Sequence, residues 1–389
     1  MFGKKDDKKI TAEQVLAALS KVMDPDLHTD IVTLGMISDI KIDGGKVFFK
    51  LTLTTPACPV KEKLEQEAKS NVAAIPGVTE VEMESTANVS TRGKVAGRED
   101  VPGIKQIVAI TSGKGGVGKT TVSINLAVAL SQLGAKVGLL DADITGPNAP
   151  LMLGVDGYEP TTRDNKIVPA ENYGVKCISM AFFVSNDTPV IWRGPMLDKA
   201  IRQFLRDVDW GELDYLIVDM PPGTGDAQLT MCQATNMAGG VVVTTPQGVA
   251  CLDARKGVAM FQQMHVPVLG MIENMSYFVG PNGERIEIFG HGGGKDLASE
   301  LEVEFLGEVP LETAVREGGD GGHPITDADG TAASSKAFLE IAQKLAAQVS
   351  IQARQPVAAG VGADAHGHAH EHGHSHGHSS HQHGPDCKH

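Results

Sequence analysis

From residue 105 onward, short apolar runs rich in β-branched residues alternate with stretches of helical periodicity. The runs are QIVAIT, KVGLLDAD, YLIVDM, GGVVVTT, PVLGMIE and EFLGEVP, and a helical stretch such as KTTVSINLAVALSQLG separates the first from the second. Continuous apolar strands separated by helices are typical of a mostly parallel sheet covered by helices on both faces. We therefore expect residues 105–350 to form one α/β domain that ends with the helix SSKAFLEIAQKLAAQV.

The N-terminal region, residues 1–90, predicts a small α+β domain. Thr11 and Gln14 have the spacing of a capping box ahead of a helix. KVFFKLTLT alternates apolar and polar residues as a strand does, a helical stretch follows it, and GVTEVEME closes the region as a further strand. Residues 91–104 are polar, contain Gly and Pro and lack periodicity, so they predict a linker.

Residues 351–389 form a low-complexity tail that holds ten of the fourteen histidines, from His366 to His389. We expect this tail to be disordered. Its imidazoles alternate with Gly, Ala and Ser, which suits the binding of zinc, nickel, copper or iron. A merely solubilising tail is the alternative interpretation, and composition does not choose between the two.

Charge and cysteine usage exclude some classes of partner. The formal net charge is −14, which argues against nucleic acid and anionic membranes. No run approaches the roughly 18 apolar residues of a membrane-spanning helix. The charged start MFGKKDDKK lacks the apolar core of a secretory signal. The five cysteines are scattered and odd in number, which is typical of a cytoplasmic protein with free thiols.

The segment IVAITSGKGGVGKT follows a predicted strand and opens a predicted helix. It matches the spacing G-x-x-x-x-G-K-[ST], in which glycines let backbone N–H groups converge on phosphate oxygens at a helix N-terminus. Lys119 is placed to reach the β- and γ-phosphates, and Thr120 to bind Mg²⁺. The predicted nucleotide contacts are Gly113, Lys114, Gly115, Gly116, Val117, Gly118, Lys119, Thr120 and Thr121.

Acidic and amide side chains follow other predicted strands. Asp141 and Asp143 end one run and Asp219 ends the next, at the edge where parallel sheets bind ligands. Asp219 suits a Mg²⁺ ion held through water. The sequence contains no N-K-x-D guanine motif, whereas Asn274 follows a late strand and its amide could read adenine. A turn asparagine is the alternative.

The loop carries one lysine more than phosphate binding requires. Because Lys119 fills the phosphate-side place, Lys114 is expected to point away from its own phosphates. It could then reach a γ-phosphate bound by a second subunit, as an arginine finger does in trans. A solvated surface lysine is the alternative, and the spacing leaves both open.

Six separated motifs within residues 11–349 resemble one known family. SGKGGVGKT resembles the deviant phosphate loop of the MinD, ParA and nitrogenase-iron-protein superclass of dimeric ATPases. Together with GLLDADITGPNAPLMLG, VIWRGPM, DYLIVDMPPGTGD, TTPQGVACLDARKGVAMF and IENMSYFV…IFGHGGG, it is similar to the Mrp (ApbC-like) iron–sulfur cluster carrier ATPases. DPDLHTDIVTLGMI and LTLTTPACP resemble the small iron–sulfur-assembly domain that is often fused to these ATPases.

The resemblance implies a homodimer in which Lys114 reaches across the interface. It also implies that Asp143 orients the attacking water, that Asp219 lies near Mg²⁺ and that Asn274 contacts adenine. The implied activity is a slow Mg²⁺-dependent ATPase, with Lys114, Lys119 and Asp143 as catalytic residues. ATP turnover would serve the binding of iron–sulfur clusters and their transfer to apoproteins, together with assembly proteins.

The chain departs from the family at the expected cluster ligands. After ENMSYFV the family usually carries C-x-x-C, whose thiolates from two subunits would bridge one cluster at the dimer interface. This chain instead has Gly280-Pro281-Asn282-Gly283. Both presumed ligands are missing.

Two cysteines then remain as cluster ligands. Cys58 matches the family's reactive cysteine in T-x-P-x-C-P and precedes a predicted helix N-terminus, where a thiolate is favoured. Cys387 lies in the tail. The other three are in apolar strand or helix contexts and are expected in the core, namely Cys177, Cys232 and Cys251.

The sequence thus predicts an ATP-dependent iron–sulfur cluster carrier of the cytoplasm. One alternative is a nickel or zinc insertion chaperone, which would use the His-rich tail and is favoured by the lost C-x-x-C. The other is a MinD- or ParA-like positioning ATPase, which would need a basic amphipathic C-terminal helix or a DNA-binding patch. The final helix is not basic and the chain is acidic overall, so the sequence favours neither a membrane-binding helix nor a DNA-binding patch.

Overall fold

The structure is a computed structural model of the chain, and it describes residues 9–91, 93, 95, 97–143, 146–183, 194–327 and 330–355. Residues 356–389, with all ten histidines of the tail and Cys387, lie outside the described residues. Among the described helices, none combines the length and the apolar character that a membrane span requires.

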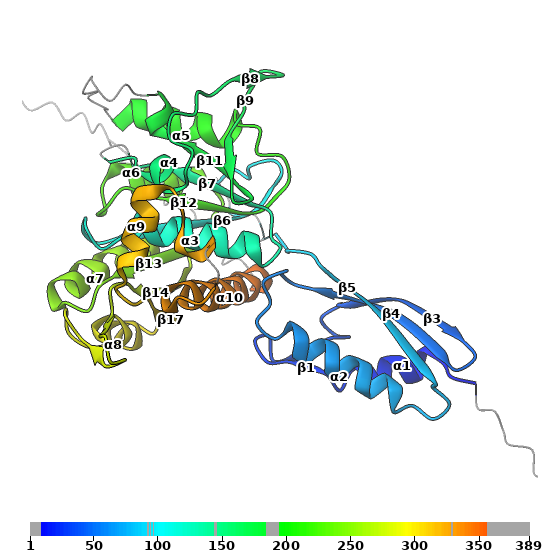
Figure 1. Cartoon of the computed structure of the whole chain (residues 1–389). Coiled ribbons are helices and arrows are strands. Elements are labelled where there is room, and N and C mark those ends of the chain that lie inside the picture. Colours follow the sequence, from blue (N-terminus) through cyan, green and yellow to red (C-terminus); the bar gives the residue numbers. More distant parts are fainter. Residues whose placement is uncertain are drawn as a thin grey trace, which may run out of the picture. The chain divides into compact units, whose positions relative to one another are not determined.

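The N-terminal region folds as helices on a three-stranded sheet (Figure 1). Its elements are α1 Ala12–Leu19, β1 Met23–Asp24, β2 Thr29–Asp30, β3 Ile37–Asp43, β4 Lys46–Leu53, α2 Lys61–Ala73 and β5 Glu80–Ala87. Thr11 and Gln14 bond each other's backbone N–H groups ahead of α1, so the predicted capping box is confirmed. Every second residue of β4 is buried, as its apolar alternation predicts.

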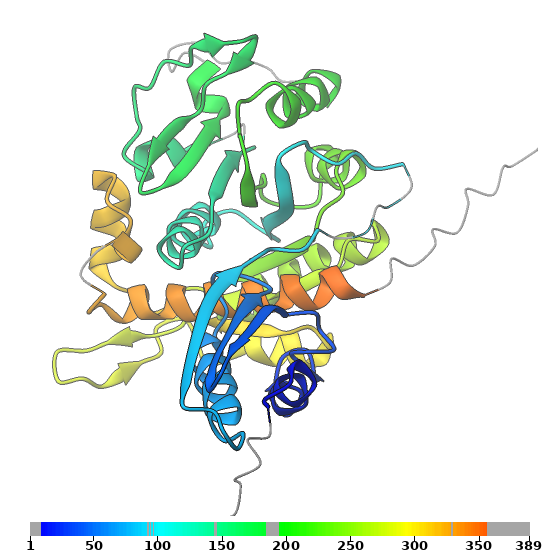
Figure 2. The same ribbon diagram turned by 90° about the vertical axis from the view of Figure 1, so that its right-hand side faces the viewer.

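The region from residue 104 onward contains one eight-stranded sheet with helices on both faces (Figures 1 and 2). In their order across the sheet, the strands are β10 Ala170–Asn172, β11 Val175–Ser179, β7 Val137–Asp141, β12 Leu213–Asp219, β6 Ile104–Ser112, β13 Gly239–Thr244, β14 Val268–Glu273 and β17 Phe305–Glu308. All neighbouring pairs are parallel except β10 with β11 at one edge. The predicted α/β fold is confirmed, and each of the six predicted runs coincides with one strand.

Helices and short hairpins complete this region. The helices are α3 Lys119–Gln132, α4 Ala149–Met152, α5 Gly194–Arg206, α6 Asp226–Ala234, α7 Gly248–Gln263, α8 Gly293–Glu300, α9 Thr313–Gly321 and α10 Ala333–Arg354, with short 3₁₀ turns η1 Met180–Phe183 and η2 Ile325–Asp327. Two-stranded pairs are formed by β8 Thr162–Arg163 with β9 Lys166–Ile167, and by β15 Phe278–Val279 with β16 Arg285–Ile286.

Two apolar cores lie on the two faces of the sheet because its strands are apolar on both sides. In β6, Val108 and Ile110 join the core that contains α3 and α10, whereas Ile107 and Ala109 join the core that contains α5 to α8. Since the central strands are parallel, their carboxyl ends meet at one edge of the sheet. Asp141 of β7 and Asp219 of β12 are register partners there.

Three segments differ from the sequence prediction. The second half of the expected linker packs against the large domain, because Glu99 forms a bridge with Thr235 at the end of α6 and Val101 is buried in a core. Helix α10 continues beyond the predicted end at residue 350 to Arg354, since its last turns are still partly buried. Strand β11 is not predicted from its sequence VKCIS, because Lys176 interrupts the apolar run. Otherwise the domain limits stay predictions.

Candidate nucleotide-binding site

The predicted phosphate loop connects β6 to α3. Strand β6 ends at Ser112 and α3 begins at Lys119, so residues 113–118 form the turn between them. Gly118 precedes the helix at φ 79°, a conformation that favours glycine. A Cβ on Gly113 would lie 2.1 Å from the carbonyl carbon of Asp253, so this glycine lets the loop approach α7. The strand–loop–helix context that phosphate binding requires is present.

Lys119 and Asp219 form a buried ion pair beside the loop. The Lys119 ammonium lies 2.8 Å from Asp219 Oδ1 and 3.7 Å from Asp143 Oδ2. Thr120 donates its hydroxyl hydrogen to Asp219 Oδ2 at 2.6 Å. The structure therefore brings four predicted site residues together. Hydroxyl and carboxylate oxygens are ligands that magnesium prefers, so the donor set of Thr120 and Asp219 fits this ion.

Asp141 holds the segment that carries Asp143. Its Oδ1 accepts the Asp143 N–H at 3.1 Å, and its Oδ2 accepts the Ala149 N–H at 3.2 Å and the Ser179 hydroxyl at 2.9 Å. Burial, and to a lesser degree the neighbouring Asp219 carboxylate, raises the pKa of Asp141 to about 7. Sequence reasoning missed Ser179 because the strand that carries it was not predicted.

Lys114 follows Gly113, whose backbone approaches α7, and its charge acts on Cys251 of that helix. A cavity of about 320 Å³ beside the loop is lined by Gly115, Gly116 and Lys119, and Lys114 is not among the described residues that line it. Lys114 is half-buried. Burial raises the pKa of Cys251 in α7, and the positive charge of Lys114 is one of the smaller opposing effects. The role of Lys114 toward its own phosphates or those of a second subunit stays a prediction.

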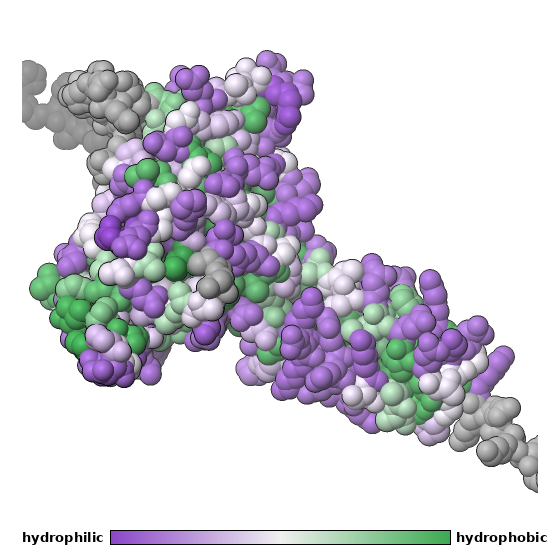
Figure 3. Space-filling model, viewed as in Figure 1, coloured by the Kyte–Doolittle hydropathy of each residue, from purple (hydrophilic) through white to green (hydrophobic). Residues whose placement is uncertain are grey.

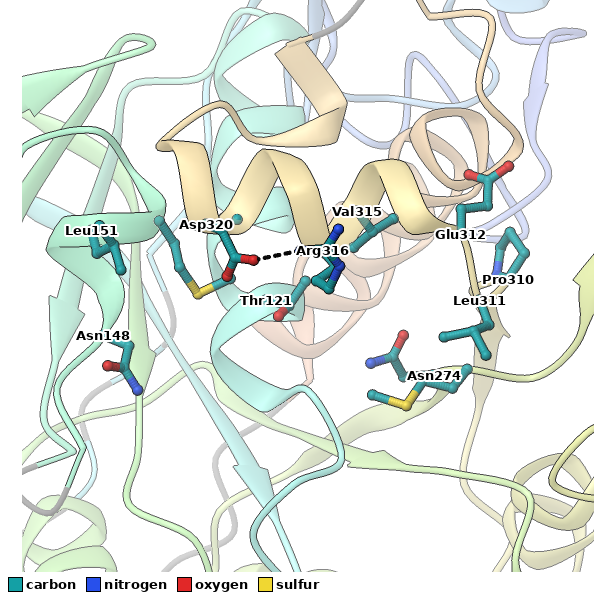
Figure 4. A pocket seen from close by; sticks show the side chains of 13 residues that line it. Thr121, Asn148, Leu151, Asn274, Pro310, Leu311, Glu312, Val315, Arg316 and Asp320 are labelled. Atoms are coloured by element: carbon teal, nitrogen blue, oxygen red, sulfur yellow. Dashed lines mark hydrogen bonds and ion pairs between the residues drawn. The ribbon is translucent and has the colours of Figure 1, made fainter.

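A second cavity, of about 450 Å³, adjoins the first, because Thr121, Asn148 and Met152 line both. Figure 4 shows its walls, with Asn148 and Leu151 on one side and residues of α9 on another. Further lining residues are Met275, Pro310, Leu311, Glu312 and Val315. The lining also includes the ion pair of Arg316 with Asp320, so apolar and polar side chains are mixed in it. Such a mixed lining suits the nucleoside part of a nucleotide.

Asn274 contacts the phosphate loop and also lines the larger cavity (Figure 4). Its Nδ2 donates to the Val117 carbonyl at 2.8 Å, and a Cβ on Gly118 would lie 2.3 Å from the same nitrogen. Asn274 is therefore part of the candidate site and more than a turn asparagine. Its contact with adenine stays a prediction.

The cysteines of the large domain lie close to the sheet. Cys177 and Cys232 are fully buried, as predicted. Cys251 is half-buried and packs against the edge of one apolar core. It lies in the first turn of α7, where the helix rises out of the core, and its Sγ donates to the Thr245 carbonyl at 3.6 Å.

The surroundings of Cys58 act against the predicted thiolate. Burial raises the pKa of Cys58 to about 11. A backbone hydrogen bond from Val60 opposes this effect, and the carboxylates of Asp24 and Asp26 add to it. The fold thus brings the motifs DPDLH and TPACP together, but the two carboxylates disfavour a further negative charge on the thiol.

A tight turn stands in the place of the family's C-x-x-C. The Gly280 N–H donates to the Glu284 carbonyl at 2.8 Å, and the Gly283 N–H donates to the Gly280 carbonyl at 2.9 Å. The β15–β16 hairpin that carries this turn projects at the left of Figure 2. Within the described ranges, no group of three or more His, Cys, Asp or Glu side chains is arranged to hold a metal ion.

Comparison with known proteins agrees with these observations. The family described as NUBPL iron-transfer P-loop NTPase matches residues 103–346, and the family described as iron–sulfur cluster assembly protein matches residues 12–83. An iron–sulfur cluster carrier protein of Synechocystis is 52% identical over 88% of this chain and 99% of its own length. A carrier protein of Deinococcus radiodurans is 46% identical over 87% of this chain and 96% of its own length.

A solved structure supports the same assignment. A nucleotide-binding protein of Archaeoglobus fulgidus, determined in complex with ADP, is 39% identical and has a TM-score of 0.51, covering 57% of this chain and 88% of that protein. The predicted family resemblance is therefore confirmed. The chain belongs to the iron-transfer P-loop NTPase family, whose relatives include iron–sulfur cluster carrier proteins, and it bears an N-terminal iron–sulfur cluster assembly domain.

Proposed function

We propose that the chain is a homodimeric, slow Mg²⁺-dependent ATPase that carries iron–sulfur clusters to apoproteins. The observation that supports this most directly is the arrangement of Lys119, Thr120 and Asp219 beside a phosphate loop in a member of the carrier family. When bound, magnesium would neutralise charge on the β- and γ-phosphate oxygens. We propose a cytoplasmic location as well.

The residues of the chain would divide the chemistry among them. Lys119 would leave Asp219 and bind the phosphates, while Thr120 and Asp219 would hold the metal ion. Asp143 is only 8% exposed and lies 3.7 Å from the Lys119 ammonium, so it could orient a water near the terminal phosphate. Because the site would position water without a strong base, hydrolysis would be slow.

Adenine is the base that we propose for the larger cavity. The support is the position of Asn274 between this cavity and the phosphate loop. Steady-state phosphate release with ATP and with GTP tests the assignment, and ATP should be preferred. Asn274→Ala should weaken that preference by about tenfold, the effect of one lost hydrogen-bonding partner. Equal turnover of the two nucleotides by the unaltered chain would contradict the adenine assignment.

Lys114 would act in the active site of a second subunit. The support is the close approach of the preceding Gly113 to α7, together with the exposed Val249 and Leu252 of that helix, which are 66% and 63% exposed. Apolar residues gather at the lower left of Figure 3, where Figure 1 places the end of α7. Exposed apolar patches mark association surfaces. Sedimentation with and without ATP measures whether the chain is dimeric.

The cargo site would be weak. With Gly280 and Gly283 unable to ligate, we propose Cys58 and Cys387 of two subunits as the four thiolate ligands of a labile cluster. Anaerobic reconstitution, with iron and sulfide counted, should give substoichiometric loading that Cys58→Ala largely removes and tail deletion weakens. A stable, full-occupancy cluster in a tail-deleted Cys58→Ala chain would implicate the other cysteines.

The lack of thiolates in the β15–β16 turn favours one second candidate function. A nickel or zinc insertion chaperone would use the His-rich tail, which lies outside the described residues, and would need no cluster ligand. Strong nickel or zinc binding by a chain that cannot be reconstituted with iron and sulfide would favour this function over cluster transfer.

A further inference from the structure

Ser123 is a buried hydroxyl that touches the carboxylate of the proposed magnesium site. It lies in α3, four residues after Lys119, and both Ser123 and Asp219 are 0% exposed. The Ser123 Oγ is 2.6 Å from Asp219 Oδ1 and 3.0 Å from the Lys119 carbonyl. A serine has one hydroxyl hydrogen, and the shorter contact to a carboxylate takes it.

Three side-chain donors therefore surround Asp219. They are the hydroxyl of Thr120 at 2.6 Å, the ammonium of Lys119 at 2.8 Å and the hydroxyl of Ser123 at 2.6 Å. The proposed function gives two of them other partners when a nucleotide binds, because Lys119 turns to the phosphates and Thr120 to the metal. Of these three donors, Ser123 alone has no such second role.

We propose that Ser123 is the positioning residue that holds Asp219 in the orientation required for magnesium when Lys119 and Thr120 have left it. This inference rests on the proposed function, since it assumes that nucleotide and Mg²⁺ bind beside the loop. Without Ser123, one oxygen of a buried carboxylate would lose its remaining side-chain donor, and the carboxylate would be free to rotate. The binding of Mg²⁺ should then weaken, whereas the phosphate loop itself is untouched.

Calorimetric titration of the full chain with ADP, once in EDTA and once over a series of Mg²⁺ concentrations, tests this proposal. Ser123→Ala should leave the affinity for ADP in EDTA nearly unchanged. In this variant, the Mg²⁺ concentration at which half of the change in ADP affinity occurs should rise by roughly tenfold. Losses of this size are seen when a hydrogen-bonding partner of a metal ligand is removed. Ser123→Thr keeps the hydroxyl and should restore most of the magnesium affinity.

Ser350 offers a matched control. Its hydroxyl donates to the Ala346 carbonyl at 2.9 Å, four residues earlier in α10, and the residue is 9% exposed. Ser350→Ala therefore removes a comparable helical serine and should not change the magnesium dependence. If Ser123→Ala is unstable, Ser123→Cys gives the same comparison, because its volume is similar and a thiol is a weaker donor.

Two results would overturn the role of Ser123 while leaving the proposed function intact. One is an unchanged magnesium dependence in Ser123→Ala and Ser123→Cys. The other is an equal loss of ADP affinity with and without Mg²⁺, which would show that Ser123 serves packing only. Failure of the proposed function looks different, because the unaltered chain would then bind no nucleotide, or would bind it with no effect of Mg²⁺.

Discussion

Around the phosphate loop, three side-chain donors surround the buried Asp219, whereas the β15–β16 turn, where the family usually carries two cysteines, offers glycines. The first region has the ligand types that a nucleotide and a hard cation need. The second has none of the thiolates that hold an iron–sulfur cluster. Both regions belong to the same domain, yet one is equipped for its ligand and the other is not.

Nucleotide turnover and cluster binding should therefore be separable by mutation. A change beside the loop should stop hydrolysis and leave cluster loading in place, and a change at the cluster ligands should do the reverse. A weak cargo site is also chemically consistent with a carrier, since a cluster that is to be passed on must leave.

Replacement of Lys119 should have the largest effect. Lys119→Ala should lower the rate of ATP hydrolysis by about a thousandfold, because it removes charge that stabilises the transferring phosphoryl group. It also leaves the buried Asp219 without its ion-pair partner, which costs about 3–5 kcal/mol of folding free energy. Lys119→Gln keeps a hydrogen-bond donor and separates the two effects. Phosphate release and thermal unfolding measure them.

Lys344 provides the control for this change. It is an exposed lysine of α10, and Lys344→Ala should change neither rate nor stability. Cluster loading of Lys119→Gln should match that of the unaltered chain. If the variant loses hydrolysis and cluster loading together, the two regions are not separable.

Replacement of Lys114 should have the next largest effect. If Lys114 stabilises the γ-phosphate of the partner subunit, Lys114→Ala should lower turnover by roughly a hundredfold and keep most of the ATP affinity. An equimolar mixture with Lys119→Ala tests the trans arrangement, because a mixed dimer places both defects in one active site and leaves the other intact. Such a mixture should recover about a quarter of the unaltered turnover. Mixed dimers without any recovery would assign Lys114 a local or solvated role.

The sequence predicted which residues lie together beside the phosphate loop better than it predicted the surroundings of Cys58. Phosphate binding depends on local spacing, so Lys119 and Thr120 could be assigned from a strand, a glycine-rich turn and a helix. Asp219 could be assigned because it ends a continuous apolar strand and parallel strands end at one edge. The covered parallel sheet followed from the same apolar runs, since only a doubly covered sheet buries both faces.

The remaining features depend on contacts between distant segments. In the sequence, nothing distinguishes Ser123 from other helical residues. Only the fold places Asp219 of β12 beside it. The thiol of Cys58 was expected to ionise because it precedes a helix, but burial and Asp24 act in the opposite direction. Neither the contact of Ser123 nor the raised pKa of Cys58 can be deduced from the residues adjacent to them along the chain.

The thiol of Cys58 should titrate at high pH. Its pKa of about 11 lies above the ordinary value of 9.0, so alkylation by iodoacetamide should be slow at neutral pH and rise about tenfold per pH unit until that pKa. Because the folded-state pKa is the higher one, stabilisation from this thiol is present below pH 9 and is lost as the pH rises through 11. Peptide mass spectrometry of the modified chain follows Cys58 separately.

A matching experiment uses the carboxylates near the thiol. Asp26→Asn removes one of the charges that raise the pKa of Cys58, so its alkylation should become faster at neutral pH. The exposed Asp39→Asn should have no effect. Rapid alkylation of the unaltered chain at pH 7 would restore the expectation of a reactive thiolate.

The smallest effect is expected from returning cysteines to the β15–β16 turn. In Gly280→Cys/Gly283→Cys, two subunits could supply four thiolates without Cys58, so reconstituted iron and sulfide should rise by roughly twofold and resist oxygen longer. The gain is limited by the backbone. A Cβ at position 280 would lie 2.4 Å from the flexible Glu284 carboxyl carbon. Position 283 has φ 82°, which costs a non-glycine residue about 1 kcal/mol or more.

Gly97→Cys/Gly157→Cys is the matched control for this pair. Both glycines have positive φ, at 81° and 80°, and open space where a Cβ would lie, so the control adds two turn thiols away from the hairpin. ATP hydrolysis should stay within about twofold in both double variants, because neither pair touches the residues that hold phosphate. Equal cluster content in the hairpin variant, the control and the unaltered chain would show that missing thiolates are not what distinguishes the cluster region from the nucleotide region.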